Sequence, residues 1–255
     1  MSSPQQPSLS TATAVRPVSL PAAYPGFHRR HLRVLFAGLG AYVLWRLAQG
    51  DLWLADRLYA LEGHHWALRD AYVTQKWLHI AGRDLSILGW CAVVVAAITS
   101  LIRADLARWR RPLAYLATAS AAGAGVVAWI KHWSNVDCPW DLARYGGTHA
   151  WLGLFQARPP TWGRGICFPA GHASAGYMWV ALFFFFVQVK PEWRGRGLAV
   201  AVAAGLLFGA AQQLRGAHFL SHDLASFLLC WGVALMLHAL FWPPSARAAH
   251  AEARA

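Results

Sequence analysis

Residues 215–242 read RGAHFLSHDLASFLLCWGVALMLHALFW, a histidine-rich polar segment followed directly by an apolar one. The apolar part, Leu224–Trp242, has 19 residues and contains no Lys, Arg, Asp or Glu. A helix of about 20 apolar residues spans the hydrocarbon core of a bilayer, because each residue adds about 1.5 Å of rise. This stretch therefore predicts a membrane-spanning helix that is preceded by a polar, histidine-containing segment.

The composition of the whole chain agrees with that prediction. Of its 255 residues, 57% are hydrophobic and only 13% are charged, and 15 are tryptophan. Soluble domains carry about a quarter of charged residues, so this balance is typical of a polytopic membrane protein with aromatic interface anchors. The net charge of +12 is then expected to set orientation and to attract anionic lipid. It does not indicate a nucleic-acid partner.

The hydrophobic pattern predicts an all-α fold, a polytopic bundle of six transmembrane helices. We expect one membrane domain over residues 29–243, between a disordered cytoplasmic tail at 1–28 and a second cytoplasmic tail at 244–255. The first tail lacks the continuous apolar core of a signal peptide. The six expected spans are Leu32–Leu52, Leu85–Ile102, Leu113–Ile130, Ala173–Val189, Leu198–Leu214 and Leu224–Trp242.

Positive residues predict the orientation of these spans. Arginines and lysines gather before the first expected span, in the second and fourth loops and in the C-terminal tail, which places both termini in the cytoplasm. The opposite, outer loops hold three polar clusters, although they also contain some arginines. These clusters are Lys131–Asp141, Cys167–His172 and Arg215–Asp223. Polar groups are energetically unfavourable in a membrane, so several of them at one membrane face indicate a functional site.

The residue types in these clusters suit phosphoryl transfer. Lys131 and Arg215 supply fixed positive charge for phosphate oxygens, and Gly171, just before an expected helix start, lets backbone amides approach an anion. His172 and His218 can exchange protons near neutral pH. A histidine nucleophile also needs a partner on its other ring nitrogen.

Two residues compete for that partner role beside His218. His222 lies four residues on, and Asp223 follows it at the start of the expected last span. The pair His218 and His222 also has the i, i+4 spacing of metal ligands. We favour a metal-free site, because Lys131 and Arg215 would repel a cation. The residues therefore imply no metal and no cofactor.

Together the clusters resemble the type 2 phosphatidic acid phosphatase superfamily, which includes vanadium haloperoxidases. That family's pattern is a lysine, six residues and Arg-Pro; then Pro-Ser-Gly-His; then Ser-Arg, five residues, His, three residues and Asp. Here Lys131 is followed after six residues by Cys138-Pro139, the second motif reads Pro169-Ala170-Gly171-His172, and Gly216–Ser221 matches the core of the third. The resemblance covers roughly Leu85 to Trp242.

The resemblance implies a role for each matching position. His218 would form a phosphohistidine, His172 would protonate the leaving oxygen, and Lys131 would bind phosphate oxygens beside the Ala170-Gly171 backbone. Four positions depart from the pattern, since Cys138, Ala170, Gln212 and His222 stand where the family has Arg, Ser, Arg and Asp. Arg215 lies three residues, nearly one helical turn, after Gln212, and we expect it to replace the missing guanidinium.

The outer loop between Lys131 and His172 carries further expectations. Cys138 and Cys167 both fall in it, and in an oxidising compartment we expect them to form a disulfide that ties the loop over the site, the alternative being two buried free thiols. Three residues around Cys138 either bind a polar head group or order the loop, and Arg83 lies on the same face. The three are Asp137, Trp140 and Asp141.

The resulting expectation is an integral-membrane phosphatase of the bacterial-type inner membrane. It would hydrolyse a lipid phosphate or diphosphate with its active site in the periplasm, and its partners would be that lipid and the bilayer. A phosphotransferase using the same site, and a degenerate lipid-binding or transport protein, stay open as alternatives.

Overall fold

The computed structural model describes residues 26–152 and 156–243, and this part of the chain is helical with no strand. The expected tails at 1–28 and 244–255 lie almost entirely outside it, except that the first helix already begins at Phe27. The elements are α1 (Phe27–Leu47), α2 (Gly50–Leu61), η1 (Val73–Ala81), α3 (Gly82–Ile102), η2 (Ala104–Trp109), α4 (Arg110–Ser134), η3 (Pro139–Asp141), η4 (Ala143–Tyr145), α5 (Gly171–Tyr177), η5 (Met178–Val180), α6 (Ala181–Val189), η6 (Pro191–Trp193), α7 (Arg194–Leu214) and α8 (Leu220–Phe241).

Five helical segments are long and apolar enough to cross a membrane. In a bilayer each backbone N–H and C=O must be satisfied within the protein, which is why such sequences fold as helices. Each segment contains most or all of one span expected from the sequence. They are Val73–Ile102, Ala104–Ser134, Gly171–Val189, Pro191–Leu214 and Leu220–Phe241.

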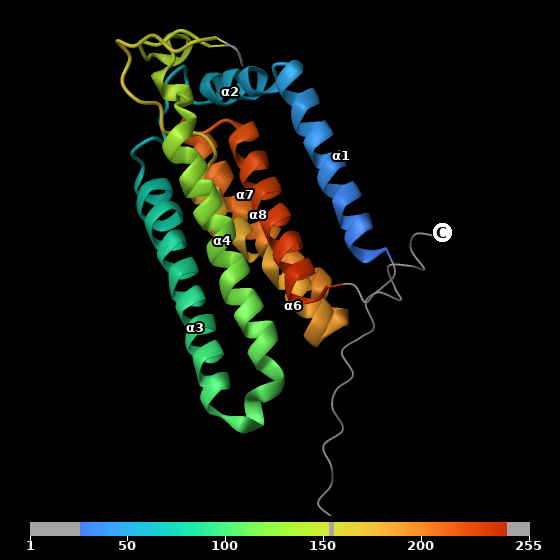
Figure 1. The fold of residues 1–255 in the computed structure, drawn as a ribbon. Coiled ribbons are helices and arrows are strands. Elements are labelled where there is room, and N and C mark those ends of the chain that lie inside the picture. The colour runs from blue at the N-terminus through green and yellow to red at the C-terminus, as the bar shows by residue number, and fades with distance from the viewer. Residues whose placement is uncertain (1–25, 153–155, 244–255) are drawn as a thin grey trace, which may run out of the picture.

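The expected first span, Leu32–Leu52, is not confirmed. The chain breaks there into two helices, because Gln49 between them takes a left-handed conformation with φ 54°. Arg46 and Asp51 on either side of the break make the stretch less apolar, and Asp51 is buried. Helix α1 packs along α8, while α2 lies across one end of the bundle (Figure 1). The all-helical prediction is confirmed, and the number of supported spans is five.

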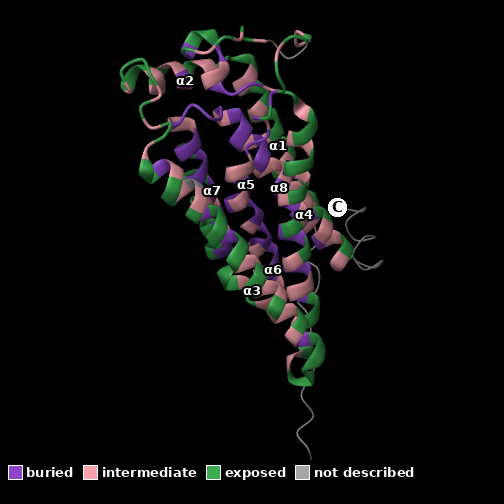
Figure 2. Ribbon diagram, turned by 90° about the vertical axis from the view of Figure 1, so that its left-hand side faces the viewer, coloured by how far each residue is buried: buried purple, intermediate pink, exposed green. Residues whose placement is uncertain are grey.

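The core lies where α4, α5, α6 and α8 meet, and α7 packs against α5 and α6. Buried residues concentrate on α5, α6 and α8, whereas α3 is largely exposed (Figure 2). Gly176 of α5 touches the backbone of α7 at Gly205, so closely that a Cβ there would clash. Small residues permit this approach between membrane helices. A buried hydroxyl links the other pair, since Tyr115 of α4 donates to the Ala234 carbonyl of α8 at 2.9 Å.

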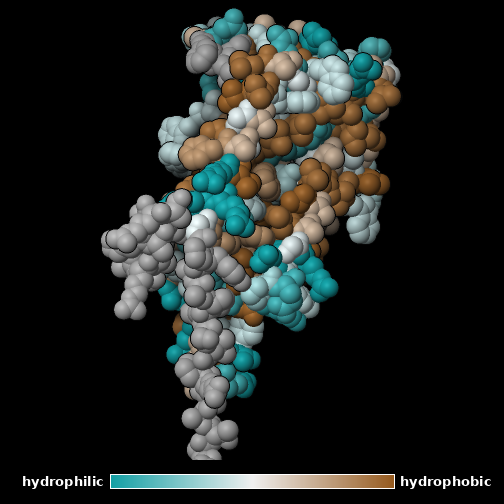
Figure 3. Space-filling view, turned by 90° about the vertical axis from the view of Figure 1, so that its right-hand side faces the viewer, coloured by the Kyte–Doolittle hydropathy of each residue, from teal (hydrophilic) through white to brown (hydrophobic). Residues whose placement is uncertain are grey.

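The outer surface of the bundle is apolar around its middle. Figure 3 shows a belt of hydrophobic side chains between hydrophilic ends. On α3, long apolar side chains are exposed, among them Leu85, Leu88, Val95 and Leu101. An apolar patch of this size marks contact with a membrane or a protein. Together with the length of the helices, it indicates a membrane-embedded bundle.

The end of the bundle that carries α2 is covered by the chain between α4 and α5. A disulfide joins Cys138 and Cys167, whose Cα atoms lie 5.2 Å apart, and this confirms the predicted pair. Beside it, Val136 and Ile166 pair as an isolated β-bridge. The loop is therefore fastened at its base, next to the end of α4 and the start of α5.

Candidate active site

The three polar clusters of the sequence meet at this covered end. Lys131 lies in the last turn of α4, His172 in the first turn of α5, and His218 just before α8. A Cβ added to Gly171 would lie 3.5 Å from the Lys131 Nζ, so the ammonium group sits over the start of the helical segment Gly171–Val189. A helix start and a cation together form a corner that favours a phosphate-sized anion.

His218 and His222 form a buried pair beside that corner. Their Nδ1 atoms are 3.4 Å apart, a long contact that one tautomer of the pair can make as a hydrogen bond. His218 is 5% exposed and His222 is fully buried. The structure thus brings His222, and not a carboxylate, next to His218.

The surroundings of His218 keep its imidazole neutral. Burial lowers the pKa of His218 well below its usual value of 6.5. The charges of His222, Lys131 and His172 lower it further, and a hydrogen bond with the Cys167 backbone opposes the shift. A neutral imidazole is the form that can attack phosphorus. The charges of Lys131 and His172 therefore reach the His218 ring.

Asp223, the other candidate partner of His218, faces a different helix. Its carboxylate accepts a hydrogen bond from the Gln213 side-chain amide of α7 at 2.5 Å. It also packs against Gly209, where a Cβ would clash with it. Asp223 therefore joins α8 to α7, and the geometry leaves His222 as the neighbour of His218.

Two further residues expected at the phosphate are held by other groups. The Arg215 Nε donates to the Arg69 carbonyl at 2.7 Å, and its Nη1 donates to the Gln212 side chain at 3.1 Å. The Ala170 N–H donates to the His222 carbonyl at 3.1 Å. Arg215 is thus hydrogen-bonded to Gln212, the residue that stands at the family's arginine position. The N–H of Ala170 is used by the first turn of α8. Of the residues expected at the phosphate, Lys131 and Gly171 form the corner described above.

The residues expected to contact a head group order the outer loop. Asp137 pairs with Arg158 at 2.6 Å and with His149 at 3.0 Å. The Asp141 carboxylate accepts from the Cys138 N–H at 3.0 Å, and the Arg69 guanidinium lies over the Trp140 ring at 4.4 Å.

Arg83, the remaining candidate, pairs with the neighbouring Asp84. It lines one cavity together with Lys131 and Gly171.

A buried polar network next to His222 was missed by sequence reasoning. Asp51, 2% exposed, accepts from Arg46 at 2.7 Å and from both the hydroxyl and the N–H of Ser221, at 2.6 and 3.0 Å. The sequence contains an indication of this network, because the charged residues Arg46 and Asp51 interrupt an otherwise apolar stretch. Charged groups at such positions mark functional or structural sites by default.

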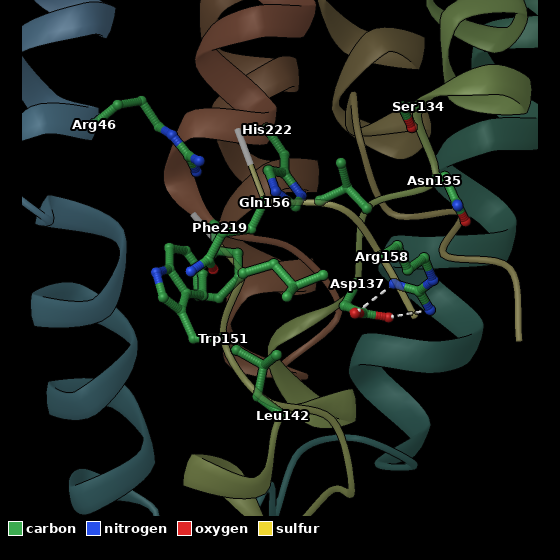
Figure 4. Close-up of a pocket in the computed structure, with 12 residues that line it drawn as sticks. Arg46, Ser134, Asn135, Asp137, Leu142, Trp151, Gln156, Arg158, Phe219 and His222 are labelled. Atoms are coloured by element: carbon green, nitrogen blue, oxygen red, sulfur yellow. Dashed lines mark hydrogen bonds and ion pairs between the residues drawn. The ribbon is translucent and has the colours of Figure 1, made fainter. Parts of the chain in front are cut away.

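Two cavities flank the end of α4. The outer cavity, of about 320 Å³, is enclosed by polar and aromatic side chains (Figure 4): Arg46, Ser134, Asn135, Val136, Asp137, Leu142, Trp151, Leu152, Gln156, Arg158, Phe219 and His222. The inner cavity, of about 410 Å³, lies between α3, α4 and α5. Its lining is mostly apolar and includes Ile87, Trp90 and Met178, and it ends at Lys131 and Gly171.

Among the described residues, one group has the spacing of metal ligands, namely Cys138, Asp141 and Cys167. Both sulfur atoms of that group are taken by the disulfide. A bonded pair of cysteines is no longer a thiolate ligand set, so this group orders the loop.

A family comparison places these residues in context. The sequence model of the PAP2 (type 2 phosphatidic acid phosphatase) superfamily matches residues 112–245, which is more than half of the chain. The chain belongs to the PAP2 superfamily. The matched region runs from α4 to the end of α8 and contains all three polar clusters, whereas α1, α2 and α3 precede it. Neither the curated proteins nor the solved structures yielded a match. Membership in this superfamily indicates phosphatase-type activity.

Proposed function

We propose that this PAP2 protein is an integral-membrane phosphatase that hydrolyses a lipid phosphate or diphosphate through a phosphohistidine on His218. The observation that carries the proposal is the corner formed by Lys131 and Gly171 at the end of an apolar cavity. The charge of Lys131 acts on the neutral, buried imidazole of His218. Phosphoryl transfer is catalysed mainly by such positioning and charge.

The chemistry proceeds in two steps. The neutral His218 ring attacks phosphorus, the bond to the lipid oxygen breaks, and His172 gives that oxygen a proton. His172 then takes a proton from water, whose oxygen attacks the phosphohistidine and releases inorganic phosphate and a free His218. Lys131 and the backbone at Gly171 stabilise the charge on the three equatorial oxygens during both steps.

The inner cavity supports a lipid as the substrate. Its apolar lining between α3, α4 and α5 lies within segments that can span a bilayer, and it leads to the Lys131 ammonium. An amphipathic phosphate could place its chain in this cavity and its phosphate at the corner. A soluble phosphate ester has no use for such a lining.

The membrane placement is part of the proposal. The excess of positive residues in the expected cytoplasmic loops supports cytoplasmic termini and an active site in the periplasm of a bacterial-type inner membrane. The partners are then the lipid substrate and the surrounding bilayer, and nucleic acid is not among them. The sixth crossing would be α1, which contacts α8 along the side of the bundle.

The test is release of inorganic phosphate from a panel of lipid phosphates by the protein purified in detergent. We expect release that vanadate blocks and that His172→Ala and His218→Ala each abolish. The variant Arg57→Ala, in an exposed position on α2, serves as the matched control. Full activity in either histidine variant would refute the assigned roles.

A binding-only protein is the second candidate, and the substituted motif positions favour it. Cys138 is held in the disulfide, Gln212 and Ala170 carry no charge, and the Arg215 guanidinium is engaged elsewhere. This alternative predicts that lipid phosphates bind without phosphate release. A phosphotransferase, the remaining variant, predicts transfer of the phosphoryl group to an added alcohol rather than to water.

A further inference from the structure

The outer cavity contains two polar groups that the described residues leave without a hydrogen-bond partner. They are the Nε of Arg46 and the Nε2 of His222, both buried and both on residues that line the cavity. Figure 4 shows the Arg46 guanidinium extending from α1 toward His222. Buried polar groups are rarely left unpaired, because each costs about 1–3 kcal/mol. Two such groups on one cavity indicate a ligand.

The chemistry of the two groups defines that ligand. The Arg46 Nε is a donor, since a guanidinium has no acceptor atom. Its Nη1 is already occupied by Asp51 and Ser221, which hold the side chain in place. The fully buried His222 is in a position to donate as well. Two donors on one cavity call for an acceptor, and a charged arginine favours an anionic oxygen.

The histidine pair determines which His222 nitrogen carries the proton. If His218 attacks with its Nε2, its Nδ1 keeps a proton and donates toward the His222 Nδ1, 3.4 Å away. The His222 Nδ1 is then the acceptor of the pair, so its proton resides on Nε2. His222 is among the residues that line the outer cavity. An anion that accepts from the Nε2–H makes the His222 Nδ1 a stronger acceptor for His218.

The other charged residues on the cavity do not occupy this position. Arg158 is neutralised by Asp137 through two hydrogen bonds of 2.6 and 2.8 Å. Asp137 is itself bound on its other side by His149. This ion pair forms one wall, and Trp151, which the Arg46 guanidinium overlies at 5.7 Å, forms another.

We propose that the outer cavity binds an anionic oxygen group that completes a relay from His218 through His222 to the anion. The proposal rests on the proposed function, since the relay acts on His218 as nucleophile. The anion supplies, through His222, the negative charge that the family pattern places directly beside this histidine as an aspartate. It is a free tetrahedral anion, because a second phosphate of the reacting lipid would lie in line beyond the bond that breaks, on the side of phosphorus away from His218. Arg46 is its main anchor and is contributed by a helix that precedes the PAP2 match.

The test measures phosphate release from dodecyl phosphate with and without added sodium sulfate, a free tetrahedral anion. The native protein is compared with Arg46→Lys, which keeps the charge beside Asp51, and with the control Arg57→Lys. A charge-assisted hydrogen bond corresponds to about a tenfold effect or more. We expect sulfate to raise kcat/KM in the native protein and in Arg57→Lys, and we expect Arg46→Lys to need about tenfold more sulfate for the same effect.

A second variant tests the relay itself. His222→Asp carries its own carboxylate in place of the relay, so sulfate should no longer accelerate phosphate release. If sulfate does not accelerate release in the native protein while phosphate is released, the relay is wrong and the phosphatase stands.

A binding arm keeps the two proposals separable. Calorimetric titration of His218→Ala with sodium sulfate measures affinity without turnover. Binding that is weakened about tenfold by adding Arg46→Lys supports the anion pocket even if no variant releases phosphate, an outcome that would remove only the phosphatase. Equal affinity with and without Arg46→Lys removes the pocket.

Discussion

Two histidine clusters occupy opposite ends of the bundle, and their neighbours separate a site from a packing element. At one end, His28 contacts His238 at 3.1 Å, and His238 contacts Gln188 at 2.9 Å. At the other, His218 contacts His222 next to Lys131 and two cavities.

The first cluster is surrounded by aromatic rings. His31 stacks near Phe27 with centroids 4.4 Å apart, and the rings of Tyr115, Phe184 and Trp242 lie within 6 Å of His238. Histidine in such surroundings acts as an amphipathic packing residue. Both ends of the bundle contain histidines. The end with His218 and His222 differs because it also has a cation, Lys131, and cavities that could hold a ligand.

The largest effect should come from exchanging the nucleophile. His218→Ala is expected to lower kcat by about 10⁴-fold or more, because a residue of a catalytic unit carries most of that unit's effect. His238→Ala, the matched change in the other cluster, should keep its turnover and lose about 1–3 kcal/mol of stability. Phosphate-release assays and thermal unfolding in detergent measure both. Equal loss of turnover in the two variants would erase the distinction between the clusters.

Removal of the cation should have the next largest effect. Lys131→Met keeps most of the side-chain volume and is expected to reduce kcat by about 10²–10³-fold, as for the loss of one donor to a developing charge. Lys76→Met, at an exposed position, is the control. If Lys131→Met changes KM alone, the ammonium group binds substrate and does not stabilise the transition state.

The disulfide should affect stability more than chemistry. Replacing Cys138 and Cys167 by serine opens a loop with a sequence separation of 29, for which chain entropy predicts a loss of about 3.6 kcal/mol. The unfolding temperature in detergent should fall, and KM should rise because the loop between the cysteines lines the outer cavity. An unchanged unfolding temperature in the double variant would show that the loop is held by its other contacts.

The pH profile should show the smallest change. Because the pKa of His218 is lowered well below 6.5, lowering the pH protonates the nucleophile only below that value, and kcat/KM should hold down to that range. In His222→Asp a carboxylate favours the charged imidazole, so the pKa of His218 rises and the acid limb moves upward by about one unit. If kcat/KM of the native protein already falls with decreasing pH at values above 6.5, the nucleophile is not neutral as proposed.

The sequence predicted the bundle and the grouping of the three clusters, because both follow from local properties. Apolar length determines a span, and motifs at the mouths of spans on one face must meet. The disulfide followed from two cysteines placed in one outer loop.

What the sequence did not predict depends on contacts across the chain. Asp51 and Ser221 are 170 residues apart, and no local pattern joins them. The break at Gln49 replaced an expected span, since a left-handed residue leaves little signal in composition. Asp223 and His222 are adjacent in sequence, and only the packing of α7 against α8 decided between them.

The most direct test of the account is a search for the covalent intermediate. The protein is mixed with a ³²P-labelled lipid phosphate, quenched in alkali to preserve phosphohistidine, and digested for peptide mapping. The account predicts label on the peptide that contains His218, retained in His238→Ala and absent in His218→Ala. Label on another residue, or phosphate release with no labelled protein at any quench time, would contradict it.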